Sequence, residues 1–182
     1  VSCHGEGEKP NIITGAWTGT VGTNPPIVYI SVRPQRYSYD ILDETGEFVI
    51  NLTTKELARA TDYCGVRSGR DVDKFKETGL TAVEATKVKA PLIAEAPVNI
   101  ECRITEKKEL GSHHIFLAEV LAVHVHAKYL DENGKFQPNK SGLIAYSHGE
   151  YLDLGKEIGT FGYSVKKKTK KPQKRRKKKV ER

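Results

Sequence analysis

The chain of 182 residues carries a formal net charge of +7 and contains three cysteines and no methionine. Its length favours one domain with a substantial core, and no apolar run is long enough to cross a membrane as a helix. Three widely spaced cysteines without a CxxC pair argue against a disulfide framework and indicate a reducing compartment, so we expect a cytoplasmic protein.

The first predicted elements lie between residues 27 and 52. Apolar runs at residues 27–32 and 48–52 predict two buried strands. Between them, a helical pattern over residues 38–45 ends at Gly46, and glycine is typical of helix C-termini.

Two further helices are predicted from their end signals. Thr53 and Glu56 have the spacing of a capping box, which opens a second helix. Ser68 and Asp71 repeat this spacing before a third helix, which ends at Gly79.

Two longer strands follow. Residues 98–105 alternate, with Val98, Ile100, Cys102 and Ile104 on one face. Residues 114–130 are rich in β-branched side chains and lead into the turn DENG. Strands joined by turns and short helices favour a closed or nearly closed barrel.

The positive charge is concentrated at the C-terminal end. Residues 166–182 carry a net +11, which leaves −4 on residues 1–165. Because such a run has no apolar face to bury and repels itself, we expect one domain, 1–165, followed by a disordered tail, 166–182. The tail could contact nucleic acid, an anionic surface or another polyanion, or it could be a solvated segment with only loose attraction. It lacks the aromatic residues that stack on bases.

A candidate phosphate site lies where the first strand gives way to a helix. A helix N-terminus presents unpaired N–H groups and a partial positive charge. With Ser38 as N-cap and Arg33 and Arg36 just upstream, this loop could hold a phosphate. The alternative is a surface loop with solvated arginines, in which Ser38 only caps.

The loop CGVRSGRDVDKF repeats this arrangement. Ser68, Gly69 and Arg70 precede a predicted helix, with Lys74 one turn in, and Gly69 would permit close approach of a ligand. The alternative is a capped surface helix.

The stretch NIITGAWTGTVGTNPP, residues 11–26, combines small residues, hydroxyl groups and Trp17. Small residues beside a strand would let a flat ligand lie on the backbone. Trp17 could equally be a core or interface aromatic.

The histidines suggest one further site. His113 and His114 are adjacent, so on a strand one would face a pocket or interface and the other would face outward. His124 and His126 share a face and could bind a metal, but no third ligand with suitable spacing stands nearby, so a solvent-facing pair is favoured. The sequence has no GxSxG, Walker or GxGxxG pattern and no zinc-ligand spacing.

These stretches, in this order, resemble the flavin reductase-like family with the FMN-binding split-barrel fold, most closely its flavoredoxin-like branch. The resemblance covers nearly all of residues 1–165. It is carried by NIITGAWTG, PPIVYISVRPQRYSYDIL, EFVINL, DYCGVRSGRDVDKF, APVNIECRI, GSHHIFLAEV and SHGEYLDLGKEIGTFGYSV. It implies a mainly β fold, a Greek-key antiparallel split barrel with short flanking helices.

The resemblance also implies positions for an FMN cofactor. The expected cofactor-binding residues are Thr14, Ala16, Trp17, Thr18, Ser31, Val32, Arg33, Arg36, Tyr37, Ser38, Asn51, Ser68, Gly69, Arg70, Asp71 and Lys74. His113 matches the family's GxH pattern and is the expected catalytic residue beside a nicotinamide site, which would make His114 the outward one. Tyr151, Phe161 and Tyr163 resemble a C-terminal segment that closes over the flavin or a partner subunit.

By resemblance, the activity would be NAD(P)H-dependent flavin reduction in a homodimer with FMN at the interface. An alternative is a flavoredoxin-like electron carrier that a partner protein reduces and that passes electrons to an acceptor protein. A less favoured alternative is a nucleic-acid- or anionic-surface-binding protein that acts through its tail. Family members usually have an additional strand before the position of Val1, so we expect the N-terminus to be incomplete, and the basic extension is not part of the family's usual core.

Overall fold

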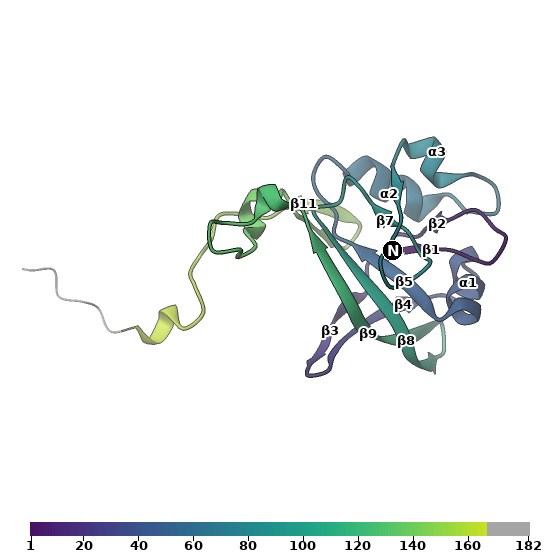
Figure 1. Cartoon of the computed structure of the whole chain (residues 1–182), viewed down its shortest axis with the longest axis horizontal. Helices are drawn as coiled ribbons and strands as arrows, with labels where there is room; N and C mark the ends of the chain where they lie inside the picture. Colours follow the sequence, from purple (N-terminus) through teal and green to yellow (C-terminus); the bar gives the residue numbers. More distant parts are fainter. Residues whose placement is uncertain (167–182) are drawn as a thin grey trace, which may run out of the picture.

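The computed structural model describes residues 1–166 (Figure 1). The expected basic tail, apart from Lys166, lies outside the described residues.

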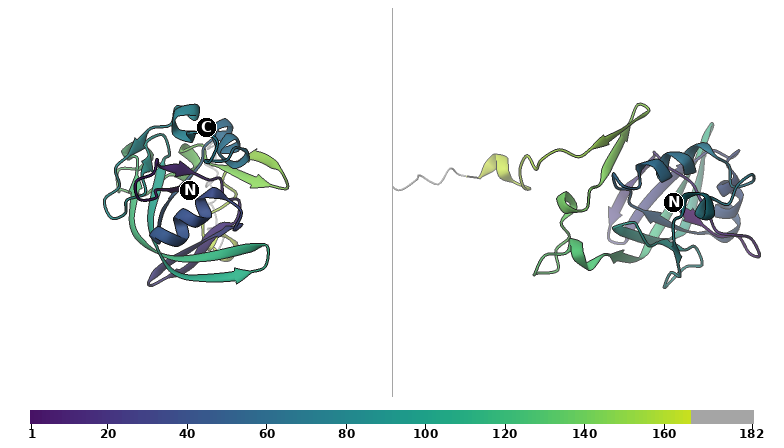
Figure 2. Two further views of the ribbon diagram at one scale, coloured as in Figure 1. Left: turned by 90° about the vertical axis from the view of Figure 1, so that its right-hand side faces the viewer. Right: turned by 90° about the horizontal axis from the view of Figure 1, so that it is seen from above.

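One antiparallel sheet organises the fold. In order across the sheet its strands are β2 (Asn11–Ile12), β1 (Ser2–Cys3), β5 (Glu47–Asn51), β8 (Val98–Leu110), β9 (His113–Val125), β4 (Pro26–Val32) and β3 (Thr18–Thr23). All its pairings are antiparallel, and the sheet curls into a barrel-like shape with β2 and β3 as its edges (Figure 2). The expected mainly β antiparallel fold is therefore confirmed.

Smaller elements surround this sheet. The helices are α1 (Tyr37–Thr45), α2 (Ala58–Val66) and α3 (Lys74–Thr78), with 3-10 turns at η1 (Ala127–Tyr129), η2 (Pro138–Lys140) and η3 (Tyr163–Val165). Two small hairpins pair β6 (Ala82–Val83) with β7 (Leu92–Ile93), and β10 (Ile144–Ser147) with β11 (Glu150–Asp153). None of the helices within residues 1–166 is long and apolar enough to span a membrane.

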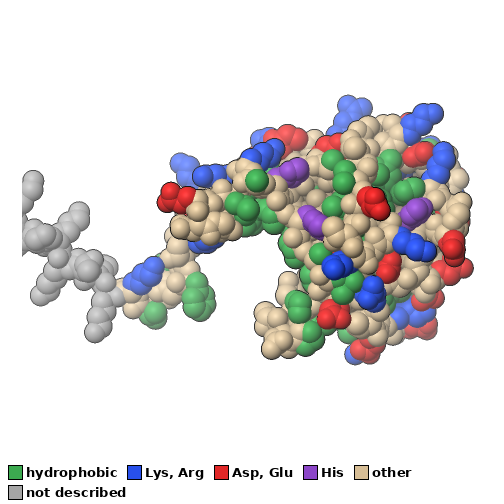
Figure 3. Space-filling model, in the orientation of Figure 1, with side chains coloured by type: hydrophobic (Ala, Val, Ile, Leu, Met, Phe, Trp, Pro, Cys, Tyr) green, Lys and Arg blue, Asp and Glu red, His purple; other side chains and the backbone are tan. Residues whose placement is uncertain are grey.

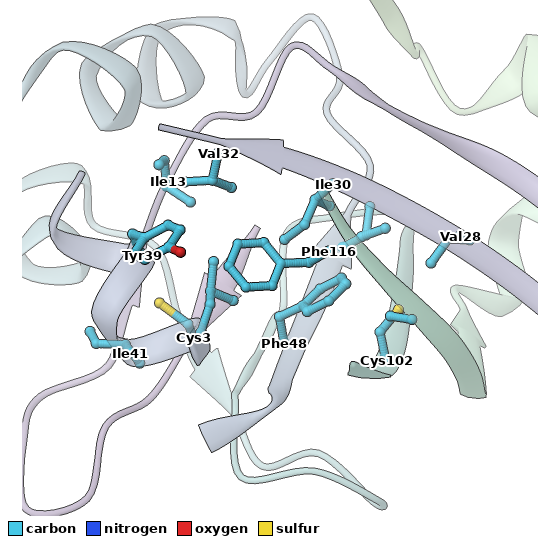
Figure 4. Packing of buried hydrophobic residues seen from close by; sticks show 13 residues of the cluster. Cys3, Ile13, Val28, Ile30, Val32, Tyr39, Ile41, Phe48, Cys102 and Phe116 are labelled. Carbon is cyan, nitrogen blue, oxygen red and sulfur yellow. The ribbon is translucent and has the colours of Figure 1, made fainter. Parts of the chain in front are cut away.

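The main core lies between the curled sheet and α1. Phe48 and Phe116 are fully buried at its centre, with Ile30 beside them (Figure 4). Leu42 of α1 is fully buried in the same cluster. On β8, the predicted alternation delivers Ile100, Cys102 and Ile104 to this core. The predicted strand at 114–130 stops at Val125, because the chain turns into η1 there.

The two predicted helix ends are confirmed, and the two predicted capping boxes are wrong. Gly46 and Gly79 end α1 and α3 at φ values of 68° and 71°, in the left-handed region that favours glycine. However, α3 begins only at Lys74, and its cap is Asp73, whose carboxylate accepts a hydrogen bond from the Lys76 N–H at 3.2 Å. The second helix, α2, begins at Ala58 without a side-chain cap bond, so neither predicted capping box opens a helix.

The loop between α3 and β8 covers the outer face of β5 and β8. Its Val88, Ala90 and Leu92 pack on Val49 in a separate small core. The fully buried Glu101 carboxylate fixes this loop by accepting hydrogen bonds from the N–H groups of Thr86, Lys87 and Val88 and from the Thr86 hydroxyl.

This covering loop corrects the expectation for His124, one residue of the second histidine pair. The His124 Nε2 atom lies 2.5 Å from the buried Glu101 carboxylate, and His126 Nε2 lies 2.8 Å from the Ala94 carbonyl oxygen. His126 is exposed, as expected, whereas the half-buried His124 faces the buried carboxylate rather than solvent. Among the described residues, no cluster of histidine, cysteine, aspartate or glutamate could hold a metal ion.

The C-terminal part of the described chain projects from the body. After η1 the chain runs through the β10–β11 hairpin and then extends outward (Figure 2). The base of the hairpin is fixed to the body, since Lys55 pairs with Asp153 at 2.7 Å and the Tyr151 hydroxyl donates to Asp62 at 3.1 Å. We call residues 154–166, beyond this base, the arm.

Candidate functional site

A cavity of about 770 Å³ opens between the edge of the sheet, α2 and the β10–β11 hairpin. We call it the main cavity. Its walls are largely apolar, with Ile12, Ile30, Val32, Ile50 and Leu57 among them. This volume and lining are typical of cofactor and small-molecule sites.

Ten of the predicted site residues line the main cavity. They are Thr14, Ala16, Trp17, Thr18, Ser31, Val32, Arg33, Arg36, Asn51 and His113. They come from the segment after β2, from β3, from the ends of β4 and β5, from the start of α1 and from β9. The fold therefore gathers these segments, which are distant in sequence, around one space.

An aromatic pair forms one wall. The rings of Trp17 and His113 have centroids 4.4 Å apart and are tilted by 44°. Trp17 is 57% exposed, so a large aromatic face remains available at the cavity. The Ser112 hydroxyl lies 3.0 Å from His113 Nδ1.

Three polar side chains of the cavity wall form hydrogen bonds within the protein. The Thr14 hydroxyl donates to the Thr61 carbonyl oxygen, and the Thr18 hydroxyl donates to that of Tyr29 at 2.8 Å. The Asn51 side chain accepts from the Ile93 N–H at 3.1 Å and donates to the Ser2 hydroxyl at 3.0 Å. These three residues therefore shape the wall as well as line it.

The start of α1 offers positive charge to the main cavity. Arg36 occupies the N-cap position, and no side chain caps the helix. The Tyr39 N–H donates to the Arg36 carbonyl oxygen at 2.9 Å, whereas the first two amides of α1 receive no side-chain cap, and Arg33 and Arg36 just before them line the cavity. Arg36 also donates from Nη1 to the Gly65 carbonyl oxygen at 3.4 Å, which links α1 to the end of α2.

Ser38 does not have the predicted capping role. It lies inside α1, is 1% exposed and accepts a hydrogen bond from Asn11 Nδ2 at 2.7 Å. Its hydroxyl therefore holds β2 to α1 and does not line the main cavity. The helix begins one residue earlier than predicted, and this places Ser38 on the buried face.

Replacing Ser38 with alanine is accordingly expected to lower the free energy of unfolding by about 1–3 kcal/mol, because a buried donor of Asn11 loses its acceptor. Denaturant unfolding of the variant measures this change. Ser147→Ala, at an exposed serine of β10, is the control and should change stability by less than about 0.5 kcal/mol. Equal stability of the two variants would contradict the assigned role.

The second predicted loop lies on the other side of the α1 start. Tyr37, Gly69, Arg70 and Asp71 line a separate cavity of about 240 Å³, which we call the minor cavity. Arg70 lies over the Tyr37 ring, 5.4 Å from its centroid, and pairs with Asp40 at 3.6 Å. These residues and Ser68 are therefore not brought to the main cavity.

The glycine of this loop permits a close approach within the protein. A Cβ atom at Gly69 would collide with the Asn11 side chain and would lie 2.6 Å from Tyr37 Cδ1. The loop is thus packed tightly on β2 and α1, and the predicted close approach to a ligand is not what its geometry shows.

Two other predicted residues are placed differently from expectation. Lys74 is only 4% exposed and lies behind the wall of the main cavity rather than on it. His114 does not face outward into solvent, because it is half-buried with its Nδ1 2.7 Å from the Tyr39 hydroxyl.

Some cavity residues were missed from the sequence. Ala60, Thr61, Asp62 and Gly65 of α2 line the main cavity, and so does Tyr146 of β10. None of these positions belongs to a recognisable motif. The only sequence signal for them is the amphipathic pattern of α2. The predicted Tyr151 lines the cavity from β11, with its ring 5.1 Å from that of Tyr146, whereas Phe161 and Tyr163 lie on the arm and are exposed.

Comparisons with known proteins agree with this geometry. The profile of the Flavin reductase like domain matches residues 1–154. The chain belongs to the flavin reductase-like family.

Relatives within this family are similar over much of the chain. A protein of Archaeoglobus fulgidus is 36% identical over 116 residues, which are 64% of this chain and 66% of that protein, so the chain spans about two thirds of this relative. The flavoredoxin structure of Desulfovibrio vulgaris (Miyazaki F) superposes with a TM-score of 0.85 at 30% identity, covering 91% of this chain and 90% of that one. The flavoredoxin of Methanosarcina acetivorans gives 0.80 at 28% identity, with 91% and 89% covered. The fold is thus that of flavin reductase-like split barrels.

Proposed function

We propose that the chain binds FMN in the main cavity and acts as an NAD(P)H-dependent flavin reductase. The observation that carries the proposal is the position of the uncapped α1 start. Its N-cap residue Arg36, together with Arg33, lines a largely apolar cavity that also has an exposed aromatic wall. A flavin nucleotide requires this combination, because it joins a planar ring to an anionic phosphate.

The residues present fit the two parts of FMN. Helix N-terminal amides and guanidinium groups are the usual protein partners of a phosphate. The apolar side chains of β4 and β5, together with Trp17, suit a planar ring system. Similarity to two flavoredoxins, proteins named for a flavin, supports the same cofactor.

When bound, FMN would supply the hydride-accepting chemistry, and the protein would supply placement and electrostatics. Arg33, Arg36 and the α1 amides would fix the phosphate. Trp17 and His113 would orient the nicotinamide substrate at the open side of the cavity, and correct orientation alone contributes several orders of magnitude to rate. Tyr146 and Tyr151 would limit the access of water from the hairpin side.

The reductase proposal is tested by mixing FMN-loaded protein with NADH or NADPH under anaerobic conditions. Loss of the visible flavin absorbance within seconds, with one of the two reductants preferred, is the expected result. His113→Ala is expected to slow this reduction more than tenfold and to leave FMN bound. Retained absorbance with both nucleotides, followed by loss on addition of dithionite, would contradict the reductase proposal.

That contrary outcome would favour the second candidate, an electron carrier reduced by a partner protein. The specific observation in its favour is the similarity to the two flavoredoxins. Both candidates use the same cavity and cofactor, so the anaerobic experiment separates them.

We further propose that the protein is a homodimer in which the arm contacts a second copy. Ile158, Phe161 and Val165 on the arm are 91%, 105% and 83% exposed, and Figure 3 shows apolar side chains on this projecting segment. Exposed apolar side chains gathered on one segment are characteristic of interaction surfaces. We favour a second copy as the partner, because the arm follows directly on the β10–β11 hairpin, which lines the main cavity.

Ending the chain after residue 154 is therefore expected to shift the dimer towards monomer, as measured by sedimentation equilibrium. A chain that ends after residue 166 keeps the arm, lacks only the basic segment and serves as the control, which should remain dimeric. If both truncated chains keep the same mass in solution as the parent, the arm does not form the interface.

A further inference from the structure

The ammonium group of Lys74 is buried directly behind the wall of the main cavity. Lys74 is 4% exposed, and its Nζ donates to the carbonyl oxygens of Ile12 at 2.6 Å and Cys64 at 2.7 Å. Ile12 and Cys64 both line the cavity. The two carbonyl groups that hold this cation therefore belong to residues of the cavity wall.

Lys74 has no carboxylate partner among the described residues. The ion pairs nearest in sequence are Lys9 with Asp73 and Arg70 with Asp40, and Lys74 belongs to neither. The titratable groups that act on it are the Cys64 thiol of α2, the Cys3 thiol of β1, Arg36 at the start of α1 and the amino group of Val1. None of these is an anion when the thiols are protonated.

This arrangement is unfavourable for the chain by itself. Burial lowers the pKa of Lys74, and the nearby Arg36 acts in the same direction. The thiols do not supply a compensating negative charge. Burial raises the pKa of Cys3 to about 11 and also raises that of Cys64, which favours the neutral thiols. A buried cation without a counter-charge costs free energy that a nearby anion would recover.

We infer that Lys74 is the buried counter-charge for the negative charge of the flavin nucleotide in the main cavity. This role rests on the proposed function. Arg33 and Arg36 are exposed, so water and salt weaken their attraction for a ligand. The charge of Lys74 acts through the protein interior, where screening is weaker, and it can therefore contribute to affinity without touching the ligand. Lys74 is thus a positioning residue for the anion.

The pKa of Lys74 in the unaltered full chain tests this role directly, since coupling between two sites is reciprocal. Carbon-13 NMR of the lysine side chains measures this pKa in the protein alone, with riboflavin, with FMN and with FMN reduced by dithionite. We expect FMN to raise the pKa by about one unit, which corresponds to about tenfold in affinity. Riboflavin, which lacks the phosphate, should raise it less.

The four conditions also distinguish the source of the anion. A larger rise with FMN than with riboflavin assigns the effect to the phosphate. A further rise on reduction, in which the ring takes up two electrons and one proton and so gains one negative charge, assigns part of it to the ring. If the pKa is the same in all four states, or if riboflavin and FMN raise it equally without a further rise on reduction, the counter-charge role is wrong.

Variants give a second measurement. Lys74→Met should weaken FMN binding about tenfold and riboflavin binding less, whereas Lys76→Met, at an exposed lysine of the same helix, should change neither by more than about twofold. Equal weakening of FMN and riboflavin by Lys74→Met would show a structural role only. If Lys74→Met does not fold, the pKa of Lys74 in the unaltered protein tests the counter-charge role.

Failure of FMN to bind the parent chain at all would overturn the proposed function itself, and titration with FMN detects that case separately.

Discussion

Replacement of both Arg33 and Arg36 with alanine is expected to weaken FMN binding by about a hundredfold or more. A hydrogen bond to a charged group contributes about 1.5–3 kcal/mol, and two are removed together. Exposure of both side chains reduces this figure, so the low end of the combined range is the expected one. Titration followed by quenching of flavin fluorescence measures the dissociation constant.

A second pair of arginines provides the matched control. Arg59 and Arg67 are also exposed and belong to no ion pair of the described residues, but they do not line the main cavity. Their double alanine variant removes the same net charge and should weaken FMN binding less than about fivefold. Riboflavin binding should hardly respond to either double variant. Similar losses of FMN affinity in the two double variants would place the phosphate elsewhere.

The second large effect is expected at Glu101, a residue of β8 that holds the covering loop and does not line the main cavity. Its carboxylate accepts from Lys87 N–H at 2.6 Å, Thr86 N–H at 2.9 Å and Val88 N–H at 3.1 Å, and it lies against His124. Glu101→Ala is expected to lower the free energy of unfolding by about 3–5 kcal/mol, because these buried donors lose their acceptor together. Thermal or denaturant unfolding measures the loss.

The same carboxylate predicts an acid-labile stability. Burial by itself would raise the pKa of Glu101, but the hydrogen bonds from Thr86, His124 and Lys87 outweigh it and lower the pKa from 4.5 to about 2. Because the folded-state pKa lies below the unfolded one, this contribution, about 3 kcal/mol, is complete above pH 4.5 and is lost as the pH falls towards 2.

Unfolding free energies measured between pH 6 and pH 2 test this sign. The parent protein should lose stability more steeply in this range than Glu101→Gln, whose amide does not titrate. Glu119→Gln, at an exposed carboxylate on β9, is the control and should follow the parent. Parallel pH profiles of the parent and Glu101→Gln would contradict the assigned contribution.

The strands and helix ends could be predicted because local sequence determines them. Apolar runs and alternation located β4, β5 and the first half of β8, and the positive φ values of Gly46 and Gly79 explain why glycine ends two helices. The ordered set of motifs led to the family, which the profile match confirms.

The misplaced residues depend on contacts between distant segments. Ser38 is buried because Asn11, 27 residues away, reaches its hydroxyl. His124 faces a buried carboxylate because the loop carrying Thr86 covers that side of the sheet, and this irregular loop has no periodicity that would reveal its position. Likewise, the sequence does not show on which side of the α1 start the loop carrying Gly69 packs.

The most direct test of the account is titration of the full chain with FMN, followed by gel filtration and a visible absorption spectrum of the protein fraction. The protein is expected to retain one FMN per chain and to bind riboflavin much more weakly, since the arginines and the start of α1 would hold the phosphate. A colourless protein at FMN concentrations up to the millimolar range, or equal affinities for FMN and riboflavin, would contradict it.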